Sequence, residues 1–352
     1  MNISNSLKAI FLLHSDKHIF FIGGLITDYK HMNKNRSYLI LKNLLILICI
    51  SFLLYEIFKN YNYIELKFRN NTDIILLIIF SKIIYHNLLS LRNYSIYKIC
   101  ANYRGKFIDW GQIFFESLIL NFLASHAGSV YRAIETKKRG LEYKKYTGMF
   151  YILFTSYILI NVFLVMMELI FIQEIGFQFK MNLLLIFLIL FTLIGYSPKI
   201  LQLFIKYNFF KKNIYKYKFL KKIFDVYEYI FSFIKSQIFL KKTIIYLIGY
   251  GVVIHLIELY IFYITSIIIQ PEIAIKTILI LFALNFILDR IPLISSIPGI
   301  NELLFASISI PLGLFFFEGL VLRLVIRVTD ITSIFVNYLI FYFSNFKNKV
   351  KF

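Results

Sequence analysis

The sequence predicts an all-α fold, that of a polytopic helical membrane protein with an inverted repeat. Of the 352 residues, 59% are hydrophobic, and the mean hydropathy is +0.72. An ordinary soluble domain is only about 45 to 50% apolar. Apolar stretches recur along the chain, and most Lys and Arg residues lie between them. Two of these stretches are interrupted by glycine and small polar residues, one in each half of the chain, as expected of a transporter built from two repeats.

The charge and cysteine content exclude other classes of protein. A formal net charge of +20 would suggest a nucleic-acid partner for a soluble protein. Here the basic residues flank apolar stretches, so orientation in a membrane and lipid contact explain them better, and no nucleic-acid partner is expected. Cys49 and Cys100 are far apart and in no metal-ligand spacing. We therefore expect no disulfide framework, metal site or cofactor.

Residues 1–38 are predicted to form an N-terminal arm that is cytoplasmic or lies at the membrane interface. The longest apolar run in this arm, residues 19–27, is too short to span a bilayer, which needs about 20 residues. No signal-peptide pattern with a small-residue cleavage site is present. The transmembrane domain is predicted to occupy residues 39–343.

The transmembrane domain contains eight apolar stretches, at residues 40–58, 74–91, 107–122, 146–172, 180–196, 243–269, 277–288 and 315–343. The third and seventh are short and lead directly into the two interruptions. Each of these two is either a full span or the inward leg of a re-entrant hairpin. Broken helix at membrane depth survives only inside a protein bundle or beside a wet cavity, so both interruptions indicate a site.

The distribution of Lys and Arg favours six spans plus two re-entrant hairpins over eight full spans. With six spans and both termini in the cytoplasm, the loop from Arg92 to Lys106 is cytoplasmic, and the basic residues outside are Lys59, Lys67, Arg69, Lys180 and Lys276. The eight-span arrangement divides the basic residues far more evenly between the two sides, against the positive-inside rule. The six-span arrangement also repeats the order of two spans, a hairpin and one span, with inverted orientation. We expect a multi-pass protein of the inner, cytoplasmic membrane.

Two further basic segments complete the predicted organisation. Residues 198–242 interleave lysine with Phe, Tyr and Ile. This pattern is typical of a helix on the cytoplasmic leaflet, where each basic residue gains on the order of 1 kcal/mol from anionic lipid. We interpret this segment as an interfacial connector, and residues 344–352 as a basic cytoplasmic tail.

The first interruption, NFLASHAGSVYR, runs from Asn121 to Arg132. Gly128 gives the backbone freedom to turn, and a helix that restarts near Ser129 would direct unpaired amides toward the middle of the membrane. With Arg132 in its first turn, this helix start could receive an anion. Alternatively, Arg132 merely begins the basic loop that follows. His126 is interpreted as a packed polar residue rather than as a ligand or proton relay.

The second interruption contains Pro298, Gly299 and Glu302. Proline disfavours helix before it, and Asn301 or Ser296 can cap the helix that follows, so a helix start near mid-membrane is expected. Glu302 would lie in its first turn, where a carboxylate stabilises the helix dipole even without any ligand. Glu302, Glu318 and His255 are groups through which a proton could drive transport, although each is equally consistent with a structural role.

The last apolar stretch carries four charged residues. A central charge costs about 2.5 to 3.5 kcal/mol on insertion scales, so these residues should face the interior of the bundle. Two interpretations remain open for Arg323, namely substrate contact and a structural ion pair. Asp330 is close enough along the helix to pair with Arg327. The four residues are Glu318, Arg323, Arg327 and Asp330.

Taken together, these motifs resemble the lysylphosphatidylglycerol synthase transmembrane, or flippase-like, family over roughly residues 41–343. The sequence departs from the family pattern at Ser125, where a proline is usual, and at Ile300 and Asn301, where glycines are usual. The residues that carry the resemblance, and that it implies as substrate-binding, are Asn121, Gly128, Arg132, Pro298, Gly299, Glu302 and Arg327.

The resemblance implies an integral membrane protein that moves an anionic lipid or a polyprenyl-phosphate carrier between leaflets in a cell-envelope or glycan pathway. It also admits an envelope glycosyltransferase as a partner. No aminoacyl-transferase domain, P-loop or nucleophile-base constellation is present, so we do not expect an enzyme.

Two other functions stay open. A membrane-embedded glycosyl or headgroup transferase would need outward-facing acids, for which the sequence offers only Glu65, Asp73, Glu174 and Glu272. A non-catalytic scaffold of an envelope biosynthesis complex would need neither hairpin charge.

Overall fold

The computed structural model describes residues 47–48, 51–123, 127–171, 241–290 and 299–350, together with residues 178, 181, 185 and 232. Within these residues the protein is all-helical, as the sequence predicts. Three of the described helices are long and apolar enough to cross a membrane. They are α4 (Thr72–Ala101), α7 (Tyr143–Phe171) and α11 (Lys241–Ile269).

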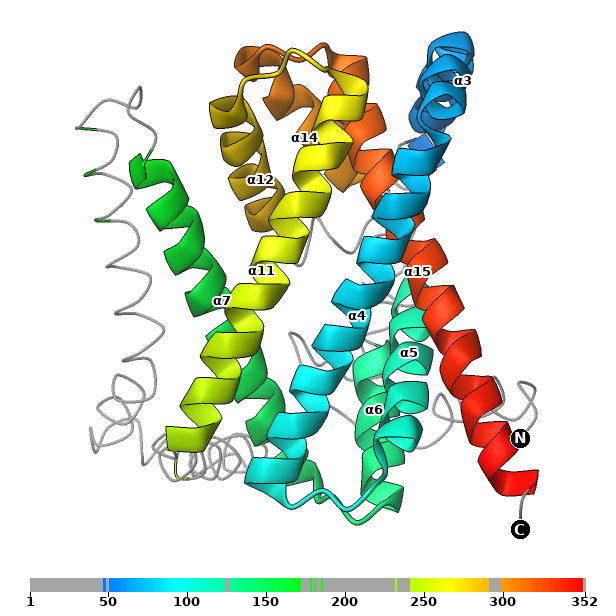
Figure 1. Ribbon diagram of the computed structural model, residues 1–352, viewed down its shortest axis with the longest axis vertical. Helices are drawn as coiled ribbons and strands as arrows, with labels where there is room; N and C mark the ends of the chain where they lie inside the picture. The colour runs from blue at the N-terminus through cyan, green and yellow to red at the C-terminus, as the bar shows by residue number, and fades with distance from the viewer. Residues whose placement is uncertain are drawn as a thin grey trace, which may run out of the picture.

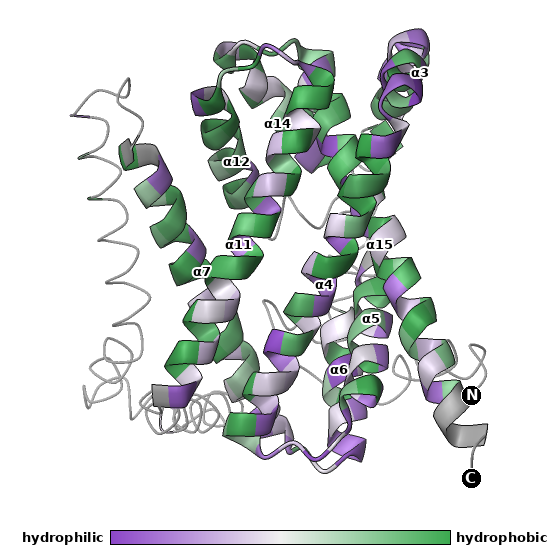
Figure 2. Cartoon of the chain, in the orientation of Figure 1, coloured by the Kyte–Doolittle hydropathy of each residue, from purple (hydrophilic) through white to green (hydrophobic). Residues whose placement is uncertain are grey.

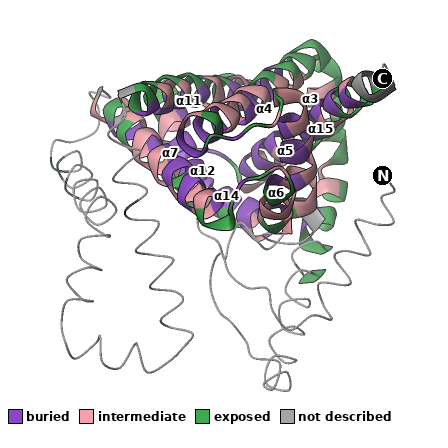
Figure 3. Cartoon of the chain, turned by 90° about the horizontal axis from the view of Figure 1, so that it is seen from below, coloured by how far each residue is buried: buried purple, intermediate pink, exposed green. Residues whose placement is uncertain are grey.

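Four long helices form the frame of the molecule. The helices α4, α7 and α11 run along its length together with α15 (Phe316–Val350), as Figure 1 shows. The helix α4 packs against α7, α11 and α15. Hydrophobic residues cover most of the frame in Figure 2, and Figure 3 shows buried residues on the inward faces of the helices and exposed residues around the rim. This pattern fits a bundle whose outer surface faces lipid.

Two short helical hairpins enter this frame from opposite ends. The first hairpin consists of α5 (Phe107–Leu123) and α6 (Ala127–Lys138), and the second of α12 (Ile275–Arg290) and α14 (Ile300–Ser309). In Figure 1 the first lies at the lower end and the second at the upper end. At 1.5 Å per residue, α6 is about 18 Å long, well short of the roughly 30 Å hydrocarbon core. Both interruptions in the sequence therefore separate the legs of a hairpin.

Each hairpin is surrounded by its own aromatic core. Around the first, Trp110 is fully buried against Tyr97 of α4, and its indole Nε1 donates a hydrogen bond to the carbonyl of Ser90 at 3.1 Å. Around the second, the rings of Phe262, Phe282 and Phe305 pack edge to face. The helix α15 contacts both hairpins, packing against α5 and against α14.

The structure extends several elements beyond their predicted limits. A helix α3 (Tyr61–Asn70) occupies a segment that the sequence analysis treats as an external loop. The helix α4 continues ten residues past Leu91 to Ala101, so Arg92, predicted to lie in a cytoplasmic loop, is buried within a helix. The helix α15 continues to Val350, which makes most of the predicted tail helical.

Other predictions cannot be compared with the structure. The arm at 1–38 lies outside the described residues. The apolar stretch at 180–196 and the connector at 198–242 lie outside them almost entirely.

Candidate functional site

In the first hairpin, Asn121 and Gly128 tie the two legs together. The side-chain oxygen of Asn121 accepts a hydrogen bond from the backbone N–H of Gly128 at 2.9 Å, which caps the start of α6. A Cβ atom at Gly128 would lie 1.7 Å from the carbonyl oxygen of Ser117, so only glycine allows the legs to come this close. The contacts of both residues are therefore contacts within the hairpin.

Arg132, one turn further along α6, is 9% exposed and faces α5. Its Nε and Nη2 atoms donate to the hydroxyl of Ser117 at 3.0 and 2.6 Å, and its guanidinium lies 4.7 Å from the centre of the Phe114 ring. A hydroxyl and an aromatic face stabilise a cation without neutralising it. Within the part of the chain that the structure describes, no carboxylate forms an ion pair with Arg132.

In the second hairpin, Gly299 and Glu302 start α14. Gly299 has a positive φ of 92°, which favours glycine, and its N–H donates to the Glu302 carboxylate at 2.9 Å. The other oxygen of Glu302 pairs with Arg327 of α15. The Glu302 side chain is 1% exposed, whereas that of Arg327 is 31% exposed. Arg327 thus neutralises the charge of a buried acid, while its own side chain remains partly exposed.

Arg323, one turn before Arg327, belongs to a second ion pair. It pairs with Asp289 of α12 and donates to the side-chain oxygen of Asn285. Asp289 also accepts a hydrogen bond from the Asn301 side chain at 2.8 Å, which links α12 to α14. Asp289 and Asn285 were not among the predicted site residues. The signal was available, since the two are four residues apart on one face of a short apolar leg that ends at the interruption.

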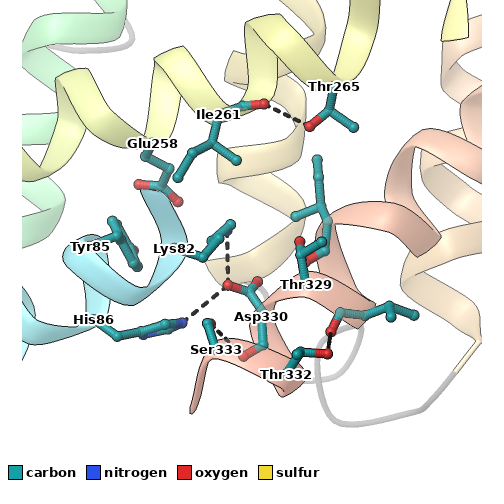
Figure 4. Close-up of polar contacts among 12 residues, drawn as sticks. Lys82, Tyr85, His86, Glu258, Ile261, Thr265, Thr329, Asp330, Thr332 and Ser333 are labelled. Carbon is teal, nitrogen blue, oxygen red and sulfur yellow. Dashed lines mark hydrogen bonds and ion pairs between the residues drawn. The ribbon is translucent and has the colours of Figure 1, made fainter. Parts of the chain in front are cut away.

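Asp330 does not pair with Arg327, contrary to the prediction. Its carboxylate instead contacts Lys82 Nζ at 2.8 Å and His86 Nε2 at 3.2 Å, both on α4 (Figure 4). Positions three apart on a helix point about 60° apart, so Arg327 faces α14 while Asp330 faces α4. Lys82 and His86 were missed, although a lysine and a histidine four residues apart inside an apolar stretch mark a polar face.

Glu318 is also placed differently from its predicted position in the bundle interior. It lies in the first turn of α15, where its carboxylate accepts the backbone N–H of Phe315 at 3.0 Å. This is a helix-capping contact. The remaining predicted site residues, His126 and Pro298, lie outside the described residues.

A small polar cavity separates α4, α11, α12 and α15. Its volume is about 30 Å³, enough for about one water molecule. The residues that line it include Lys82 of α4, Glu258 of α11, Asn285 and Asp289 of α12, and Asp330 of α15. Glu258 accepts a hydrogen bond from the Tyr157 hydroxyl at 3.0 Å. The cavity thus gathers three carboxylates at the centre of the frame.

Comparisons with protein-family models, with curated proteins and with solved structures gave no match. Among the described residues, no group of three or more His, Cys, Asp or Glu side chains could hold a metal ion. The chemistry of the site rests on its charges. The second hairpin and α15 form closed ion pairs, whereas the first hairpin contains a buried cation that lacks an acidic partner among the described residues.

Proposed function

We propose that this chain is an integral membrane protein that binds an anionic lipid or a polyprenyl phosphate and moves its headgroup between leaflets. The observation that carries the proposal is Arg132. Among the residues that the structure describes, the partners of this buried guanidinium are a hydroxyl and an aromatic ring, and such an arrangement is costly in a membrane bundle. A phosphate headgroup would supply the missing negative charge in bidentate geometry.

The hairpin architecture supports this assignment. Two hairpins that enter from opposite ends give a polar headgroup one receiving structure for each leaflet. The resemblance to the flippase-like family points to the same class of substrate and to envelope or glycan synthesis. In this proposal Arg132 receives the phosphate, and Arg327, partly exposed beside Glu302, takes it over at the second hairpin.

The proposed topology has six spans, two re-entrant hairpins and both termini in the cytoplasm, in a cell that synthesises an envelope. Single cysteines at Arg104, in the loop before α5, and at Glu272, in the loop before α12, test it in a background without Cys49 and Cys100. A membrane-impermeant maleimide should label the two positions from opposite sides of intact cells or spheroplasts. Labelling from the same side would contradict the inverted repeat.

The binding site is tested by the lipids that stay with the detergent-purified protein. Mass spectrometry should find an anionic lipid enriched over the bulk membrane in the wild type and lost in Arg132→Ala. Arg139→Ala is the matched control, because Arg139 lies in the turn directly after α6 and is paired with Glu135 at 3.1 Å. This control variant should keep the lipid.

Movement is tested with fluorescent phosphatidylglycerol and a labelled polyprenyl phosphate in reconstituted vesicles, using dithionite to quench the outer leaflet. Wild type should expose the inner pool at least tenfold faster than Arg132→Ala. If the two proteins retain only bulk lipid and move neither probe, the hairpin charges are structural and the scaffold alternative takes precedence. Loss of an envelope phenotype on changing Glu65, Asp73, Glu174 and Glu272 would instead favour a transferase.

A further inference from the structure

A second polar cluster lies between α7 and α11, away from both hairpins. His255 of α11 is 0% exposed, and each of its ring nitrogens has a partner on α7. Nδ1 lies 2.7 Å from the side-chain oxygen of Asn161, and Nε2 lies 2.7 Å from Oε1 of Glu168. The other oxygen of Glu168 is buried without a hydrogen-bond partner in the described part of the chain.

The hydrogen bonds of this cluster fix where its protons are. The amide nitrogen of Asn161 donates to the carbonyl of Tyr157 at 2.7 Å, so the Asn161 oxygen faces His255 and accepts a hydrogen bond from the N–H of Nδ1. The 2.7 Å contact between Nε2 and Glu168 then needs one more proton. Imidazolium with carboxylate and imidazole with carboxylic acid both satisfy it, and both are neutral overall.

The state of protonation therefore decides whether the contact exists. With one proton, the pair forms a short hydrogen bond. A second proton can sit on the free oxygen of Glu168, and the contact still holds. With no proton, the Nε2 lone pair faces a carboxylate lone pair, and the two atoms repel each other across the interface between α7 and α11.

Along α11, the pair lies within one helical turn of a residue that lines the central cavity. On α11, Glu258 follows His255 by three residues and lines the cavity together with Lys82 of α4, Asp289 of α12 and Asp330 of α15. In Figure 4 the side chain of Glu258 points toward Tyr85 and Lys82.

The remaining neighbours include one further charge. The hydroxyl of Tyr157 on α7 donates to Glu258 and lies 3.5 Å from the hydroxyl of Tyr85, and α12 presents the ring of Phe282 to His255. The guanidinium of Arg92 on α4 lies 5.1 Å from the centre of the Tyr157 ring.

We propose that His255 and Glu168 form a proton-binding site that holds α7 against α11 and releases the two helices when their shared proton leaves. On release, the shared proton leaves Nε2 or the Glu168 carboxyl and passes to water or to Glu258 on the same helix as His255. Proton binding is independent of any substrate. Its coupling to lipid movement rests on the proposed function, in which it gives the protein a means to use a proton gradient.

The site is tested first by solid-state NMR of ¹⁵N-histidine-labelled protein in phosphatidylcholine and phosphatidylglycerol bilayers. The chain has six histidines, and His255→Gln assigns the signal. We expect the His255 Nδ1 signal to be that of a nitrogen that carries a hydrogen, because Nδ1 donates to Asn161. The Nε2 signal should change in Glu168→Gln and remain unchanged in Glu142→Gln, an exposed control. An Nε2 signal that ignores Glu168→Gln would overturn the proposal.

The latch is tested by the distance between spin labels at Phe154 and Ile248, exposed positions on α7 and α11. Raising the pH should widen this distance in wild type. In Glu168→Gln the amide can donate to neutral imidazole, so the distance should not depend on pH. Where Glu168→Gln does not fold, His255→Gln takes its place. A distance that does not change with pH in wild type would contradict the latch.

The vesicle assay separates this inference from the proposed function. An imposed proton gradient should accelerate movement of labelled phosphatidylglycerol in wild type at least threefold and leave Glu168→Gln unaffected. If wild type moves no lipid while the NMR coupling and the distance change are present, the proposed function fails and the proton site stands. If lipid moves but neither spectroscopic change occurs, the proton site is wrong and the lipid function stands.

Discussion

The first and second hairpins follow similar paths from opposite ends of the frame, but they balance charge differently. Each has a charged residue near the start of its second leg, Arg132 in the second turn of α6 and Glu302 in the first turn of α14. The carboxylate of Glu302 forms an ion pair with Arg327 and accepts a hydrogen bond from the N–H of Gly299. Arg132 is held by the Ser117 hydroxyl and the Phe114 ring.

This difference in charge balance predicts different roles for the two hairpins, one in the stability of the fold and the other in the binding of an anion. A cation that is already in an ion pair attracts an anionic ligand less strongly than an unpaired cation does, and removing one partner of a buried pair leaves the other without a counter-charge. A buried cation with only neutral partners keeps most of its attraction for an anion. We therefore expect changes in the second hairpin to reduce stability most, and changes at Arg132 to reduce binding most.

The largest expected effect is on the second hairpin. Arg327→Ala leaves the fully buried Glu302 carboxylate without a cation, so we expect a loss of about 3 to 5 kcal/mol in the free energy of unfolding. The measurement is thermal unfolding of the purified protein in detergent, followed by size-exclusion chromatography. The double variant Glu302→Gln with Arg327→Met removes both charges and should recover most of the loss. A single variant as stable as wild type would break the comparison.

The next effect is steric and belongs to the first hairpin. Gly128→Ala places a methyl group 1.7 Å from a backbone oxygen of α5, which must force the legs apart and cost about 1 to 3 kcal/mol. Gly249→Ala on α11 is the matched control, because nothing lies within 4 Å of its added carbon. Equal unfolding temperatures for the two variants would show that the close packing of α5 on α6 does not determine stability.

The sequence predicts much of this architecture from lengths and interruptions. The apolar stretches at 107–122 and 277–288 become α5 and α12, and a second, shorter helix follows each interruption. The helix start expected near Ser129 occurs at Ala127, where Asn121 caps it. These features depend on local rules, namely glycine and proline at breaks and polar caps at helix starts, which a sequence displays directly.

The pairing of charges was not predicted in the same way. Arg327 and Asp330 are neighbours in sequence, yet one faces α14 and the other faces α4. Only the packing of α15 between these helices decides this, and helical spacing on a single chain segment contains no such information. Asp289, Lys82 and His86 were missed for a related reason, since their partners are distant in sequence. Arg92 was predicted to lie in a loop because it follows the end of the apolar run, but α4 continues past that point.

A smaller effect is expected from the cap of the first hairpin. Asn121→Ala removes the acceptor for the Gly128 N–H and should cost about 1 kcal/mol. Asn121→Asp retains the acceptor and should retain stability, but it adds a negative charge to the hairpin that contains Arg132. If Arg132 receives an anion, this variant should lose lipid without losing unfolding temperature. Full lipid retention by Asn121→Asp would place the anion elsewhere.

The smallest expected effect on stability is at Arg132 itself. Arg132→Met keeps the apolar stem and removes the charge, and no acid among the described residues loses a partner. The Ser117 hydroxyl still donates to the carbonyl of Phe114 at 2.6 Å, so no buried donor is left unsatisfied. We expect a change within about 0.5 kcal/mol in unfolding, because the lost hydrogen bonds and the relief of a buried charge oppose each other. Together with complete loss of the copurifying lipid, this result would identify a residue that serves binding rather than folding. A loss as large as that of Arg327→Ala would instead mean that Arg132 has an acidic partner, and that the two hairpins are electrostatically alike.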